Sequence, residues 1–92
     1  MQDSNEINQT RIDRMLQLLE VSLNPTEISI TDESHLHAGH AGAKSGKGHF
    51  NLVIKSEKFT GLLPLKRHQL VYGSLGEMMQ TDIHALKIKA TV

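Results

Sequence analysis

A glycine-rich segment at residues 34–48 divides the chain and limits the folds that it can adopt. It holds four glycines and three histidines, and a single leucine is its only large apolar residue. A stretch with so little apolar surface cannot contribute to a core, so we expect a long, mobile hairpin loop. Apolar and polar residues alternate on both sides of it, at residues 28–31 and 49–55, which predicts two strands joined by this loop. With only 92 residues, all elements must share one small core.

A helix is expected before this hairpin. Thr10 and Asp13 have the spacing of a capping box, which predicts a helix that begins at Thr10. Asn24 and Pro25 end the pattern. Its apolar residues recur at three- and four-residue intervals: Ile12, Met15, Leu16, Leu19 and Leu23.

A second helix and a third strand are expected after the hairpin. The helical stripe covers residues 65–80, where Gly73 and Gly76 indicate close backbone packing, a break, or both. On this stripe we expect His68 to be half-buried and Tyr72 to lie in the core. The closing strand follows at residues 84–90, with its first residue on the core-facing side.

The order helix, strand, strand, helix, strand predicts an α+β fold. The second and third strands are joined by a helical crossover, so they should run parallel in a three-stranded sheet. We expect both helices on one face of this sheet and one domain over residues 7–92, after a flexible N-terminus at residues 1–6. The covered face should carry Phe50, Leu52, Ile54, Leu86 and Ile88, whereas His49 should lie on the other, polar face.

Charge and motifs argue against both a dedicated nucleic-acid binder and an enzyme. Ten basic residues balance ten acidic ones, which is not the basic signature of a dedicated nucleic-acid binder. The sequence has neither a phosphate-binding glycine loop nor a serine nucleophile on a predicted rigid element. The N-terminus is polar and the apolar runs are short, so we expect no signal peptide and no membrane span, and we place the protein in the cytoplasm.

Histidines suggest a metal site. His35, His37 and His40 lie in the glycine-rich segment, His84 opens the closing strand, and the chain has no cysteine. Imidazoles without thiolates can donate one or two ligands but are poorly suited to hold an iron–sulfur cluster alone, so a partner should supply the rest. The alternative is a structural His84 and a loop that binds zinc or nickel adventitiously.

Four motifs together resemble the BolA family. They are D-E-S-H-L-H-A-G-H-A-G at residues 32–42, G-H-F-N-L-V-I at 48–54, K-F-T-G-L-L-P-L-K-R-H-Q-L-V-Y at 58–72 and I-H-A-L at 83–86. The resemblance covers residues 7–91, and the long loop is similar to that of the long-loop BolA branch. It implies a fold similar to the class II KH domain, in the order αββαβ.

The resemblance also implies a function. Such proteins are partners of monothiol glutaredoxins and share a bridging 2Fe–2S cluster in iron–sulfur trafficking or iron and redox regulation. The glutaredoxin cysteine and glutathione would supply thiolates, while His84 and a loop histidine would supply imidazoles. Alignment places the loop ligand at His37, with His35 and His40 as competitors. No cluster is expected in the isolated chain, which should be a monomer or a weak homodimer.

DNA binding is the rival function. Some BolA proteins are described as transcriptional regulators of stress response and cell shape, and the KH-like architecture permits contact with nucleic acid. Phosphate contacts would come from basic residues of the strands and of the second helix. These are Lys55, Lys66, Arg67, Lys87 and Lys89.

Overall fold

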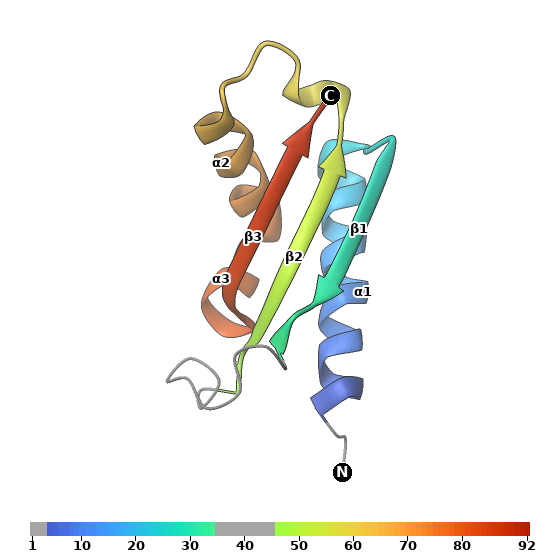
Figure 1. The fold of residues 1–92 in the computed structure, drawn as a ribbon, viewed down its shortest axis with the longest axis vertical. Helices are drawn as coiled ribbons and strands as arrows, with labels where there is room; N and C mark the ends of the chain where they lie inside the picture. The colour runs from blue at the N-terminus through green and yellow to red at the C-terminus, as the bar shows by residue number, and fades with distance from the viewer. Residues whose placement is uncertain (1–3, 35–45) are drawn as a thin grey trace.

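The computed structural model describes residues 4–34 and 46–92 (Figure 1). The long helix α1 and the strand β1 precede the undescribed segment, and the remaining elements follow it. Their bounds are α1 Ser4–Leu23, β1 Glu27–Asp32, β2 Gly48–Lys55, the 3-10 helix η3 Glu57–Phe59, α2 Pro64–Leu75, α3 Met78–Thr81 and β3 Ile83–Thr91.

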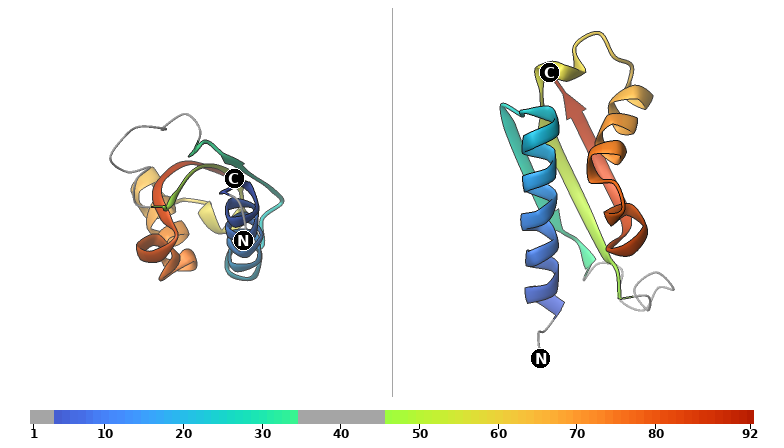
Figure 2. Two further views of the ribbon diagram at one scale, coloured as in Figure 1. Left: turned by 90° about the horizontal axis from the view of Figure 1, so that it is seen from below. Right: turned by 180° about the vertical axis from the view of Figure 1, so that it is seen from behind.

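The three strands of the described residues form one sheet in the order β1-β2-β3. β1 runs antiparallel to β2, as in a hairpin, and β3 runs parallel to β2 after the crossover through α2 and α3. The helices all lie on one face of this sheet, as the end-on view in Figure 2 shows. The predicted α+β class, the αββαβ order and the placement of the helices are confirmed.

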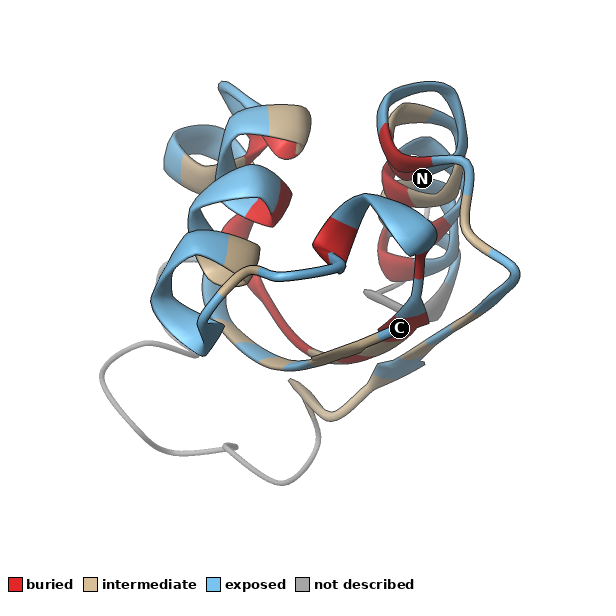
Figure 3. Ribbon diagram, turned by 90° about the horizontal axis from the view of Figure 1, so that it is seen from above, coloured by how far each residue is buried: buried red, intermediate tan, exposed pale blue. Residues whose placement is uncertain are grey.

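The core lies between the sheet and this helix layer, where the buried residues of both meet (Figure 3). Alternation in β2 directs Phe50, Leu52 and Ile54 toward the helices, as predicted, and all three are buried. Leu86 and Ile88 of β3 pack against the same cluster. The helices contribute Ile12, Met15, Leu19, Leu23, Val71, Leu75 and Met78 to this core.

The short helix η3 lies between α1 and α2 at one end of this layer (Figure 3). Its Phe59 has an exposed fraction of 0%. Ser56 precedes it and is fully buried, and its hydroxyl donates to the Leu23 carbonyl and accepts from the Lys58 N–H. The residue therefore satisfies a carbonyl at the end of α1 and an N–H of η3 at the same time.

The predicted start of the first helix was wrong. α1 begins at Ser4, and Thr10 lies inside it, where its hydroxyl donates to the Glu6 carbonyl at 3.0 Å. The predicted flexible N-terminus at residues 1–6 thus overlaps α1 in its last three residues. Tertiary contacts explain the extension: Asn8 is buried against the sheet and its amide donates to Asp32 at 3.1 Å. Such contacts stabilise turns that no local capping signal marks.

The second predicted helix is interrupted. α2 ends at Leu75 because Gly76 has φ 57°, a positive value that glycine adopts readily because it has no Cβ. The short α3 then leads into β3. The expectation of a core Tyr72 was also wrong, since this side chain is 41% exposed, whereas His68 is half-buried as expected.

Two glycines should respond oppositely to alanine. A Cβ at Gly48 would overlap the ring of Phe50, which is buried and cannot move aside, so Gly48→Ala should destabilise by about 1–3 kcal/mol. A Cβ at Gly73 meets no atom of the described residues within 4 Å, and the residue lies inside α2. Gly73→Ala should therefore stabilise by about 0.5–1 kcal/mol. Urea unfolding of both variants measures the change in the free energy of unfolding. Changes of the same sign in the two variants would contradict the expectation.

Candidate metal centre

His84 lies on a β-bulge at the start of β3. Ile83 pairs with Gly48 and Ala85 pairs with the next residue, His49, so His84 is the extra residue of the irregular register. The insertion shifts the alternation: Ile83 is buried, His84 and Ala85 are exposed, and the inward pattern resumes at Leu86. The predicted core-facing position of His84 was therefore wrong, and its imidazole is accessible to a partner.

The ring of His49 lies against that of His84. Their centroids are 4.9 Å apart and the ring planes are tilted by 47°. His49 occupies the face of β2 opposite to Phe50, as predicted, but it is only 5% exposed and is not a surface residue. Its backbone N–H donates to the Ser34 hydroxyl at 3.0 Å, and its carbonyl accepts from the Glu33 N–H at 2.8 Å. These bonds fix the backbone from which the imidazole extends.

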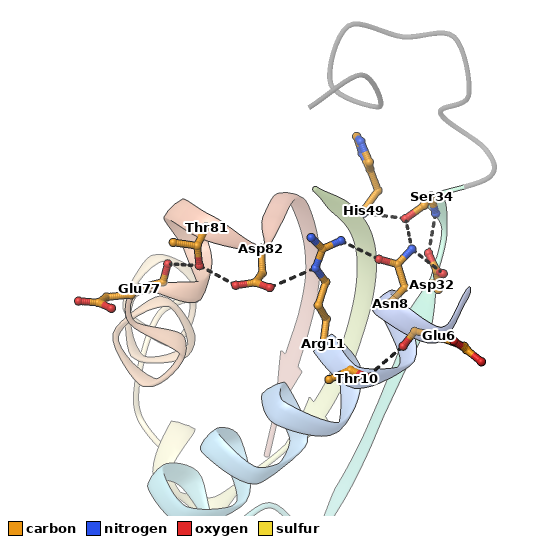
Figure 4. A network of polar contacts seen from close by, with 10 residues as sticks. All are labelled: Glu6, Asn8, Thr10, Arg11, Asp32, Ser34, His49, Glu77, Thr81 and Asp82. Carbon is orange, nitrogen blue, oxygen red and sulfur yellow. Dashed lines mark hydrogen bonds and ion pairs between the residues drawn. The ribbon is translucent and has the colours of Figure 1, made fainter. Parts of the chain in front are cut away.

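Asn8 connects α1 directly to the end of β1 and, through Ser34, to β2 (Figure 4). Its amide nitrogen donates to an Asp32 oxygen at 3.1 Å and to the Ser34 hydroxyl at 3.3 Å. Its carbonyl oxygen accepts from Arg11 at 2.9 Å. The residue therefore couples the end of β1, and through Ser34 the backbone of His49, to the first turns of α1.

Arg11 extends this network to β3. Its guanidinium lies 3.1 Å from the Asp82 carboxylate (Figure 4). The Asp82 carbonyl in turn accepts from the Gly48 N–H at 2.9 Å. A hydrogen bond from Thr81, together with the charge of Arg11, holds the pKa of Asp82 below its usual range. Asp82 lies two residues before His84, so the network anchors the strand end that carries the exposed imidazole.

Asp82 should make the stability of this strand end depend on pH. Because its pKa is lower in the folded than in the unfolded chain, the carboxylate stabilises the fold above the unfolded-state pKa of about 3.9. This contribution is lost as the pH falls through the folded-state pKa. Asp82→Asn should thus destabilise the protein near neutral pH and flatten its acid unfolding curve, measured by circular dichroism. Asp13→Asn, at an exposed position of α1, is the matched control, and identical curves for both variants would contradict the expectation.

The loop candidates His35, His37 and His40 lie outside the described residues. The described ends of their segment, at Ser34 and Gly46, lie at the same end of the sheet as the start of β3 (Figure 1). Within residues 4–34 and 46–92, no group of three or more His, Cys, Asp or Glu side chains could hold a metal ion. Among the described histidines His84 is exposed, whereas His49 is buried and His68 half-buried, and a single exposed imidazole suits a site completed by other ligands.

Most of the basic residues predicted for DNA already have protein partners. Lys55 lies 3.6 Å from Glu27 and Lys87 lies 3.2 Å from Glu33. Arg67 has a structural role, because its guanidinium donates to the Leu62 carbonyl at 2.8 Å and to the Ala90 carbonyl at 2.9 Å. Lys66 and Lys89 are exposed. The five residues fall into two groups, three on the strands and two in the first turns of α2.

Sequence reasoning missed the polar network. Asn8 precedes Ile12 by four residues and so continues the apolar stripe of α1, which is a signal for an inward-facing polar group. Arg11, Ser34 and Asp82 carry no comparable signal. Their partners come from other elements, and only the fold brings them together.

No helix in the described part of the chain is both long and apolar enough to cross a membrane.

These features define the class of the protein: a small KH-like α+β domain with an accessible histidine at one end of its sheet. The sequence model described as BolA-like protein matches residues 19–92, and the chain belongs to this family. In sequence it is 45% identical over 89 residues to "Protein BOLA1, chloroplastic" of Arabidopsis thaliana, covering 94% of this chain and 55% of that protein. It therefore spans about half the length of this relative.

Two further relatives bear on fold and function. The structure of the BolA domain of SufE1 from Arabidopsis thaliana superposes with a TM-score of 0.78 at 41% identity, covering 88% of this chain and 90% of that one. The "DNA-binding transcriptional regulator BolA" of Escherichia coli is 36% identical, covering 83% of this chain and 70% of that protein. The first likeness supports the fold in detail, and the second relative is named as a regulator.

Proposed function

We propose that this protein is a non-enzymatic partner of a monothiol glutaredoxin and co-ligates a bridging 2Fe–2S cluster in iron–sulfur trafficking or redox regulation. The observation that supports it is the exposed imidazole of His84 on a bulge braced by the Arg11–Asp82 pair. A loop histidine would supply the second imidazole, with His37 the first candidate and His35 and His40 the alternatives. The glutaredoxin cysteine and glutathione would supply the thiolates.

The residues of this chain suit that role chemically. A neutral imidazole is a ligand for iron, and replacing thiolates by histidines lowers the negative charge at a cluster and raises its reduction potential. Histidine ligands must lose a proton to bind, so acid should release the cluster. The isolated chain should hold no cluster, since it has no cysteine to supply the thiolate ligands. We further propose that it acts in the cytoplasm and is alone a monomer or weak homodimer.

Anaerobic co-expression with a monothiol glutaredoxin tests the proposal. We expect a coloured heterodimer with the visible absorption and circular dichroism of a 2Fe–2S cluster, and a colourless BolA-like protein when it is purified alone. Size-exclusion chromatography before and after removal of the iron reports whether the cluster bridges the two chains. A colourless mixture, or a cluster held by glutaredoxin alone, would refute the proposal.

Transcription regulation is the second candidate, favoured by the name of the Escherichia coli relative. Lys55, Lys87 and Lys89 lie on the polar face of β2 and β3, where Lys55 and Lys87 are paired with acidic residues and Lys89 is exposed. Binding of a DNA duplex should weaken with salt, and Lys89→Ala should lower the salt slope by about one. Absence of binding at low salt would eliminate this function.

A further inference from the structure

We propose that His49 is a positioning residue that orients the imidazole of His84 for coordination. This inference rests on the proposed function, since it concerns the same ligand. The ring centroids of His49 and His84 are 4.9 Å apart, although the two residues are far apart in the sequence. The bulge in β3 creates the contact, because it turns His84 toward the sheet face that His49 occupies.

The two histidines differ in how firmly they are held. His49 is 5% exposed, and the backbone on which it stands is hydrogen-bonded on both sides, to Ser34 and to Glu33. Its packing leaves the ring little freedom. His84 is exposed, and an exposed side chain samples several rotamers. The fixed ring of His49 should exclude some of the His84 rotamers before a metal binds.

Pre-orientation matters because ordering a ligand side chain opposes binding. Residues that hold a histidine ligand in place commonly change metal affinity by about 10- to 100-fold when they are replaced. His49 itself is too buried to reach an iron held by another protein without leaving its site. Its contribution therefore acts through His84.

Two substitutions separate positioning from ligation. His49→Ala removes the ring that packs on His84, whereas His49→Phe keeps a planar ring but has no nitrogen to coordinate a metal. His68→Ala, at a half-buried position on α2, is the control for loss of an imidazole elsewhere. Thermal unfolding of the wild type and the three variants checks that each protein is folded. If His49→Ala does not fold, His49→Phe still tests the inference.

The first measurement uses the isolated chain. Three-bond couplings and ring carbon relaxation report the rotamers of His84 by NMR. We expect one dominant χ1 rotamer in the wild type, in His49→Phe and in His68→Ala, and averaged rotamers in His49→Ala. If His84 is equally averaged in the wild type, or unchanged in His49→Ala, the inference is overturned while the proposed function stands.

The second measurement uses the cluster-bridged complex with glutaredoxin. We expect His49→Ala to shorten the cluster lifetime by about tenfold and His49→Phe to restore most of it. Equal losses in both variants would overturn positioning in favour of direct ligation. If the wild type forms no bridged cluster, the proposed function and this inference fail together, whatever the NMR result.

Discussion

Replacement of His84 by alanine is expected to shorten the lifetime of the cluster-bridged glutaredoxin complex by at least about 100-fold. Even residues that only support a ligand change metal affinity by about 10- to 100-fold, and loss of the ligand itself should exceed this. Because His84 is exposed on a bulge, the isolated fold should lose less than about 0.5 kcal/mol. The lifetime is read from the decay of visible circular dichroism under anaerobic conditions.

Variants of the other histidines make this experiment specific. His68→Ala should leave the cluster lifetime unchanged, because its half-buried side chain lies on α2, away from the bulge. Single alanine substitutions of His35, His37 and His40 identify the second ligand, and we expect the largest loss at His37. A cluster indifferent to His84→Ala would remove the basis of the proposed function. Unfolding of the isolated His84→Ala variant would instead reveal a structural role.

Phe59→Ala should be strongly destabilising, by about 3–5 kcal/mol. The ring has an exposed fraction of 0% and belongs to the cluster of buried core residues, so its removal leaves a cavity that the surrounding residues close only in part. A domain of this size has a total stability of about 5–15 kcal/mol, so a large share is lost. Urea unfolding followed by circular dichroism measures the change.

Tyr72→Ala is the matched control for this aromatic position. Its side chain is 41% exposed on α2, so the loss should stay below about 1 kcal/mol. The pair of variants compares a buried with an exposed aromatic residue in neighbouring elements. Equal losses in the two variants would mean that η3 does not support the helix layer as the structure indicates.

Patterns within one segment predicted most of the fold. The alternation at residues 49–55 identified β2 and its inward face, because side chains of a strand point to opposite sides at every step. The patterns on both sides of residues 34–48 predicted the hairpin, and the helical stripe that follows predicted a crossover to a parallel third strand. These features depend on residues close to one another in the sequence, so the pattern of apolar residues is enough to predict them.

Errors arose where distant residues decide the local structure. The capping signal at Thr10 is reasonable for an isolated peptide, but contacts of Asn8 with β1 extend α1 back to Ser4. The stripe that placed Tyr72 in the core continues through Gly76, where the backbone turns and the helix ends. Periodicity alone cannot show which side of a helix finds a partner.

The candidate site shows the same division most clearly. The residues themselves indicated a donor of imidazole ligands, since a chain with six histidines and no cysteine can offer nitrogen but not thiolate to a metal. The exposure of His84, its contact with His49 and its support by Arg11 and Asp82 came only from the tertiary structure. Strict alternation placed His84 inside, and one extra residue in the β2–β3 register turned it outward, because a bulge depends on how two strands pair and not on either strand alone.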